Sequence, residues 1–226
     1  RERQSCDGEW IGSNDGDPSS SRAAVAGEVT VDSLLDLSAL PDTATEICLV
    51  SRSVPDASPI VRLGAAATEA EVKRLAAGPM RAARIVHFAT HGLVAGGGDV
   101  PMEAGLVFTP PARPDEADDG YLSSSEVAEL ELFAELIVLS ACNTAAGGAA
   151  AAEPLGGLAA AFFAAGASGL YVTHWDVRSR ATADLIEAAF EAPRGAYASA
   201  LHRAKRAAIE TVEGGFSHPE NCGAFV

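Results

Sequence analysis

Three segments of the sequence end in side chains that can take part in nucleophilic or acid–base chemistry. Thr90 to Gly92, Ser140 to Asn143 and Thr173 to Asp176 each follow a short apolar run. A thiol needs a nearby base to become a thiolate near neutral pH, and histidine is the side chain whose ordinary pKa suits that task. These residue types predict attack on a carbonyl group by Cys142, with His91 or His174 as its base.

The apolar runs that precede these side chains must position them. Runs over residues 84–90, 136–141 and 169–174 alternate with helical patterns, which predicts parallel strands. Loops after the carboxyl ends of parallel strands converge at one edge of an open sheet. We therefore expect an α/β fold with three layers, in which helices flank a central, mainly parallel sheet and the reactive ends share one edge.

Capping and breaking residues set the bounds of the other elements. Thr68 to Glu71 has the capping-box pattern, so a helix should run from there to about Ala77. Pro154 and Gly166 bound a helix that is apolar nearly all round and is expected to be buried. The further expectations are a short strand over Ile60 to Leu63, a surface hairpin from Gly105 to Leu122, a helix capped by Ser123 with Glu126, and helices marked by Leu185 and Leu201.

Composition and charge exclude several classes of protein. The formal net charge of −15 argues against partners that are bound through their phosphates, so neither nucleic acid nor an anionic membrane is expected. Four cysteines without a CxxC pair indicate neither a zinc ribbon nor a dense disulfide framework, which fits a reducing cytoplasm. Residues 1–30 are rich in Gly, Ser and Asp, so we predict a disordered linker there and one domain over residues 31–226.

The spacing of the two central candidates adds weak evidence. His91 stands 51 positions before Cys142, and in caspases the histidine precedes the cysteine by about 50 residues. The caspase sequence around the cysteine is absent, and Cys142 could instead be a small buried hydrophobic residue. Its place just after the predicted strand favours the exposed site.

Longer sequence motifs around these residues resemble those of a known family. His87 to Gly92, Glu135 to Thr144 and Val172 to Trp175 are similar to the CHAT domain, a caspase-like module that often follows tetratricopeptide repeats. This family belongs with the caspases, separases and gingipains. Further matching phrases are Leu40 to Thr43, Gly105 to Val107, Gly120 to Leu122 with Glu126, and His218-Pro219 with Ala224 to Val226. The resemblance covers roughly residues 40–226, and its terminal strand stops early.

The resemblance implies a cysteine endopeptidase that needs no metal and no cofactor. Carried over by position, Cys142 is the nucleophile, His91 is the base that later protonates the leaving amine, and the backbone amides of Gly92 and Cys142 form the oxyanion hole. The implied partners are a protein or peptide substrate and an upstream repeat or sensor domain in the same polypeptide. The abrupt ends of the sequence indicate a segment of such a longer polypeptide.

The residues around the dyad suggest a substrate pocket. Asp176 lies beyond the third strand, where it could pair with a basic P1 side chain, as acidic S1 pockets do in separases and gingipains; the alternative is an exposed turn acid. We place His174 and Ser140 in the same pocket. His87 and His91 have an i, i+4 spacing that could bind zinc on a helix, but the flanking residues favour a strand, so we expect His87 to be a packed strand histidine.

Two other functions remain open from the sequence. One is a pseudoenzyme that acts as an interaction scaffold, since Arg178, Arg180 and Cys222 depart from the family pattern. The other is a non-peptidase thiol hydrolase that uses Cys142 with His174. Its expected Gly-x-Cys-x-x-Gly turn is missing here, because neither neighbour of Cys142 is a glycine.

Overall fold

The structure, a computed structural model, describes most of the central part of the chain. The described residues are 6, 23–25, 30–37, 39–53, 58–94, 103–115, 117–140, 154–173, 185–187, 193, 195–210 and 225. Within these ranges, no helix has the length and apolar character that crossing a bilayer requires.

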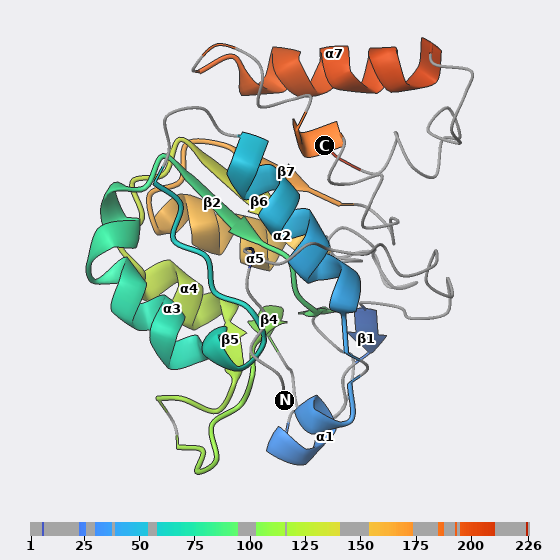
Figure 1. Cartoon of the computed structure of the whole chain (residues 1–226). Coiled ribbons are helices and arrows are strands. Elements are labelled where there is room, and N and C mark those ends of the chain that lie inside the picture. Colours follow the sequence, from blue (N-terminus) through green and yellow to red (C-terminus); the bar gives the residue numbers. More distant parts are fainter. Residues whose placement is uncertain are drawn as a thin grey trace.

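A three-stranded parallel sheet forms the centre of the molecule (Figure 1). It contains β2 (Ile85–Phe88), β6 (Leu136–Leu139) and β7 (Leu170–Val172), in the order β2-β6-β7. Both pairs of neighbours are parallel. All four residues of β6 are buried, as expected for the middle strand of a sheet that is covered on both faces.

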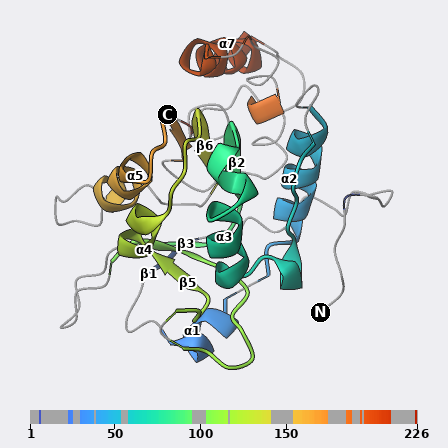
Figure 2. The same ribbon diagram turned by 90° about the vertical axis from the view of Figure 1, so that its left-hand side faces the viewer.

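Helices cover both faces of this sheet, and side-chain alternation along β6 shows which helix lies on which face. Ile137 and Leu139 share a hydrophobic cluster with α3 (Glu69–Ala76), α4 (Ser124–Glu129) and α5 (Pro154–Ala164). Leu136 and Val138 pack in a second cluster with α2 (Pro41–Ser53) and α7 (Tyr197–Glu210). In Figure 2, α5 and α2 accordingly lie on opposite sides of β2 and β6. The predicted α/β fold with a flanked, mainly parallel sheet is confirmed.

A second sheet continues from the end of β2. It contains β1 (Ala23–Val25), β3 (Gly92–Val94), β4 (Gly105–Val107) and β5 (Tyr121–Ser123), in the order β1-β3-β4-β5. The pair β1·β3 is parallel, and the other two pairs are antiparallel. Leu34 of α1 (Val31–Leu35) packs against this sheet in a small apolar cluster with Leu93, Val107 and Tyr121.

The capping signals in the sequence correctly mark the starts of two helices. The Thr68 hydroxyl accepts a hydrogen bond from the Glu71 amide at the start of α3, although the Glu71 carboxylate binds Arg62 and Arg74 instead of completing a capping box. Ser123 and Glu126 form a full capping box at α4. The remaining short helices are 3₁₀ turns, at Gly64–Ala66 and Pro79–Ala82.

Two predictions about single elements are wrong. Residues 60–63 form no strand, and Ile60 is half exposed, because the segment pairs with no strand among the described residues. Helix α5 is not buried all round, since Phe163 is also half exposed while Phe162 is fully buried. The predicted hairpin at Gly105 to Leu122 is confirmed as β4 and β5, but Leu106 and Leu122 lie in the core and only the connecting loop is peripheral.

Three parts of residues 1–30, where we predicted a linker, have defined structure. Strand β1 pairs with β3, and Cys6 forms a disulfide bond with Cys48 of α2. The Arg52 guanidinium also donates a hydrogen bond to the Cys6 carbonyl. The cysteine pattern did not predict this disulfide, because the two residues are 42 positions apart in the sequence. Thr30 caps α1, which begins at Val31, the predicted start of the domain. The other residues of this segment, 1–5, 7–22 and 26–29, lie outside the described residues.

Candidate active site

Strands β2 and β6 bring two of the three reactive strand ends to the same edge of the sheet. Phe88 is opposite Leu139 in the register, and the Ser140 amide donates to the Phe88 carbonyl at 2.9 Å, which extends the ladder by one residue. His91 follows Phe88 after three residues, and Cys142 follows Ser140 after two. Phe88 and Leu139 lie opposite each other on adjacent parallel strands, and His91 and Cys142 are each three residues further along the chain.

His91 lies at the junction of the two sheets, between the end of β2 and the start of β3. Its carbonyl accepts a hydrogen bond from the Val107 amide of β4 at 2.9 Å, and the neighbouring Thr90 hydroxyl donates to the Val107 carbonyl. The next residue, Gly92, pairs with β1 and β4. His91 is only 7% exposed. Its backbone is thus held from both sides, so the imidazole starts from a fixed position.

Three other predicted site residues, Cys142, His174 and Asp176, lie outside the described residues. The residue before His174 is described. Thr173 follows β7, is 1% exposed, and forms an antiparallel bridge with Phe225. The third strand therefore reaches the same carboxyl edge just before His174, as the sequence predicted.

A buried polar cluster joins the two strand ends beneath this edge. The His87 Nε2 atom lies 2.9 Å from Glu46 Oε1 and 3.1 Å from Ser140 Oγ. The side chains of His87 and Glu46 are 8% and 0% exposed. His87 is the packed strand histidine that the sequence predicted. Ser140 is 1% exposed, and its hydroxyl oxygen lies against His87; its contact with substrate stays a prediction.

Sequence reasoning missed Glu46. It lies one helical turn before Val50, a core residue of α2, so the spacing puts a carboxylate on the buried stripe of the helix. Glutamate is almost never fully buried unless it is paired. The signal was therefore present, but the partner, His87, is 41 positions away and could be identified only from the fold.

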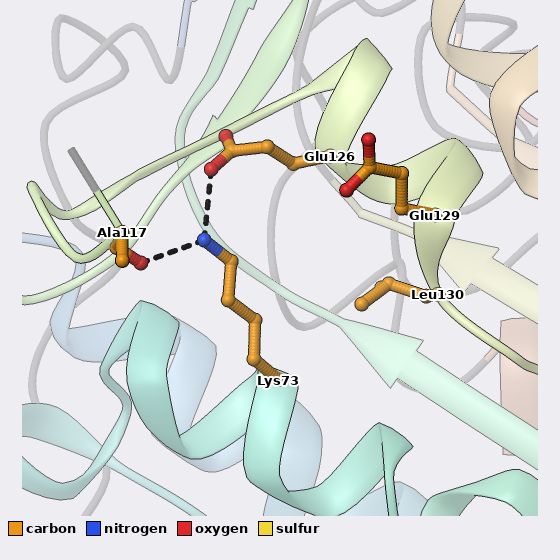
Figure 3. A pocket seen from close by; sticks show the side chains of 5 residues that line it. All are labelled: Lys73, Ala117, Glu126, Glu129 and Leu130. Carbon is orange, nitrogen blue, oxygen red and sulfur yellow. Dashed lines mark hydrogen bonds and ion pairs between the residues drawn. The ribbon is translucent and has the colours of Figure 1, made fainter.

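A hollow between α3 and α4, of about 390 Å³, lies apart from this edge and is lined by Lys73, Ala117, Glu126, Glu129 and Leu130. Figure 3 shows the Lys73 ammonium group between Glu126 and the Ala117 carbonyl; these contacts measure 2.8 and 2.7 Å, and Glu69 accepts a third bond. Burial lowers the pKa of Lys73, but the hydrogen bonds to Glu126 and Glu69 outweigh it and leave this pKa raised. All three protons of the ammonium are thus used within the protein, and the hollow is a structural ion-pair site.

Burial raises the pKa of Glu69, although hydrogen bonds from Lys73 and from the Gly120 and Asp119 amides oppose the shift. Its Oε2 atom accepts both of these amide hydrogens at 2.9 Å. The carboxylate therefore anchors the end of the loop between β4 and β5 to helix α3. This role is structural and lies outside the predicted active site.

Comparison with protein families identifies the chain. The family model for the CHAT domain matches residues 11–225. The chain belongs to the CHAT domain family. A search of curated proteins finds no match. The match begins 29 residues before the part of the chain that the sequence motifs covered, so it adds β1 and α1.

CHAT domains are a caspase-like family, which gives this chain a peptidase-related classification. The α/β fold agrees with it, since the parallel sheet β2-β6-β7 lies between two helical layers. In this CHAT domain, the sequence motif that contains His91 runs from β2 to β3 and so connects the two sheets. The motif that contains Cys142 includes the fully buried strand β6. The disulfide departs from the cysteine usage expected of a cytoplasmic protein, and that location stays a prediction.

Proposed function

We propose that this CHAT domain is a cysteine endopeptidase that uses Cys142 as nucleophile and His91 as general base. The observation that carries the proposal is the register of β2 and β6, which starts the chain toward both residues from paired positions at one edge of the sheet. Active sites of open parallel sheets lie at this carboxyl edge. The family match supports the same assignment.

The chemistry follows from a thiol and an imidazole at one edge. His91 takes the proton of Cys142, and the thiolate attacks the scissile carbonyl to give a tetrahedral intermediate. When this intermediate collapses, the C–N bond breaks, and the imidazolium of His91 gives its proton to the leaving amine. Water then attacks the thioester, His91 accepts a proton from it, and the acid product leaves as the Cys142 thiol is restored.

Two backbone amides are proposed to stabilise the oxyanion of both intermediates, those of Gly92 and Cys142. Gly92 follows the base directly, and the absence of a side chain lets substrate approach the backbone closely. Donors that are already fixed in place lower the barrier without reorganising, and removal of one costs about 10²- to 10³-fold in rate. The pairing of Gly92 with β1 and β4 provides such a fixed backbone.

The test is cleavage of a peptide library by the purified protein and by single variants. Cys142→Ala is expected to abolish cleavage, because no other group replaces the thiolate, and His91→Ala is expected to reduce it nearly as far. His174→Ala is expected to retain substantial activity. Matched controls are Cys222→Ala and His202→Ala, the latter on the exposed side of α7, and both are expected to cleave like the unaltered protein.

Two results would contradict the proposal, and each favours a different alternative. Loss of cleavage with His174→Ala but not with His91→Ala would support a thiol hydrolase that uses Cys142 with His174. A protein that cleaves no peptide, and whose Cys142 resists alkylation, would support an interaction scaffold. Regulation by a fused or partner sensor domain also belongs to the proposal, and adding that partner is the control for a silent protein.

A further inference from the structure

The buried cluster of Glu46, His87 and Ser140 joins three separate elements of the fold. Glu46 comes from α2, His87 from β2, and Ser140 from the residue directly after β6. Alternation explains why they meet. His87 is opposite Val138 in the register, and Ser140 comes two residues after Val138, so both side chains point to the face that α2 covers.

Both contacts of His87 are to the same ring nitrogen. An ionised Glu46 only accepts hydrogen bonds, and the His87 Nε2 atom, 2.9 Å from Glu46 Oε1, then carries the hydrogen. Ser140 Oγ lies 3.1 Å from the same nitrogen and can take only the second branch of this bond. Because Nε2 has no free electron pair, it cannot accept a proton from Ser140. The cluster is therefore no Ser–His–Glu catalytic triad, in which the acid and the serine bind different ring nitrogens.

A metal site fits these residues no better. The described part of the chain contains no group of three potential metal ligands, and Glu46 and His87 already bind each other. Packing alone also gives a poor account, because apolar side chains of similar volume would fill the space without the cost of burying a carboxylate. A polar cluster differs from apolar packing because hydrogen bonds are directional, so they fix the relative positions of the three elements.

The cluster lies close in the sequence to both residues of the proposed dyad. His87 precedes His91 by four residues on the same strand and its exit, and Ser140 precedes Cys142 by two. We propose that Glu46, His87 and Ser140 are positioning residues, whose hydrogen bonds fix the two strand ends from which His91 and Cys142 extend. This inference rests on the proposed function, because it assigns these residues a role through that dyad.

The proposal predicts a specific pattern of kinetic effects. Glu46→Ala and His87→Ala are expected to lower kcat about ten- to hundredfold, while KM changes little, because a misplaced catalytic group affects the reaction more than it affects substrate binding. His87→Gln is expected to regain most of the rate, since the glutamine amide can donate to both Glu46 and Ser140. Ser140→Ala removes the second branch of the bond from Nε2 and leaves the contact between His87 and Glu46, so its effect is expected to be smaller than that of Glu46→Ala.

A matched control comes from Glu69, the other glutamate that is buried within the described ranges of the chain. Glu69 is 1% exposed and also binds a cation, Lys73, but it anchors α3 and the loop before β5. Glu69→Gln is expected to lower the melting temperature and leave kcat unchanged. Glu46→Gln is expected to lower both. This pair separates loss of stability from loss of positioning.

The alkylation rate of Cys142 provides a measurement that needs no substrate. Iodoacetamide labels the thiolate, peptide mapping identifies the modified cysteine, and His91→Ala sets the rate without a base. In Glu46→Ala and His87→Ala, Cys142 is expected to react almost as slowly as in His91→Ala, with Cys222 as the reference thiol in each sample.

The outcomes distinguish the two proposals. Folded Glu46 and His87 variants whose kcat and Cys142 alkylation rate match the unaltered protein would overturn the positioning role, even if their melting temperatures fall. Failure of His87→Gln to restore either rate would also overturn it. If the unaltered protein cleaves nothing even with the sensor partner added, the proposed function fails, and the alkylation comparison alone decides whether the cluster positions His91 and Cys142.

Discussion

At the scale of single residues, type and spacing identified the candidate dyad but not what supports it. His91 and Cys142 stand out because each follows an apolar run, and a strand end is a position that sequence can predict. Glu46 and His87 could be recognised singly as a misplaced acid and a strand histidine, but no local pattern pairs residues 41 positions apart. The same limit applied to Ser140, whose burial depends on α2 covering its face of the sheet.

Substrate preference is also a property of single residues. Asp176, beyond the third strand, is predicted to bind a basic P1 side chain, and the net charge of −15 favours the approach of basic peptides. A charge-assisted hydrogen bond contributes about 1.5 to 3 kcal/mol, so cleavage after Arg or Lys is expected to exceed cleavage after Leu or Asp by about tenfold or more. The measurement is the cleavage rate for matched peptides that differ only at P1.

The same peptides with Asp176→Asn provide the control. The preference for Arg is expected to disappear, because a neutral amide keeps the size of the side chain but loses its charge. Arg178 and Arg180 are close in sequence and compete for the carboxylate. A preference for Asp at P1, or a preference for Arg that survives Asp176→Asn, would remove Asp176 from the pocket.

At the scale of secondary structure, the sequence predicted the end of an element correctly where neighbouring residues alone determine it. Caps, a first-turn proline and helix-ending glycines depend on a few adjacent residues, so the bounds of α3 and α5 and the start of α4 were predictable. The error at residues 60–63 has the opposite cause. An apolar run becomes a strand only if another strand pairs with it, and that depends on the whole fold.

Gly166 shows how one residue sets the placement of an element. It ends α5 with φ +105°, and a Cβ atom there would lie 2.2 Å from the Leu132 carbonyl oxygen. Gly166→Ala is therefore expected to lower the free energy of unfolding by about 1 to 3 kcal/mol, through backbone strain and displacement of the segment before β6. Denaturant unfolding of the purified variant measures this change.

Gly157, inside the same helix, is the matched control. A Cβ atom there would meet nothing within 4 Å. Gly157→Ala is expected to raise the free energy of unfolding by about 0.5 to 1 kcal/mol, because alanine loses less conformational freedom on folding. If Gly166→Ala and Gly157→Ala change the free energy of unfolding equally, the close contact with the Leu132 carbonyl oxygen does not affect stability.

At the scale of the whole molecule, α2 connects the N-terminal segment to the site. Cys48 of this helix is bonded to Cys6, and Glu46, two residues earlier, contacts His87. The helix thus carries both a covalent tie to residue 6 and a hydrogen bond to the central sheet. The disulfide bond is lost under reducing conditions, so the free energy of unfolding is expected to depend on reductant.

Reduction of the disulfide is expected to destabilise the protein. Opening a covalent loop that spans 42 positions costs about 2 to 4 kcal/mol, chiefly because the unfolded chain gains freedom. Denaturant unfolding with and without dithiothreitol measures the difference, and Cys6→Ala should show the reduced value under both conditions. Identical unfolding of the native protein with and without reductant would contradict a structural disulfide and favour the predicted reducing cytoplasm. A reductant-sensitive fold would show that the disulfide stabilises the domain, in contrast to the cysteine usage of most cytosolic proteins, whose thiols are kept reduced.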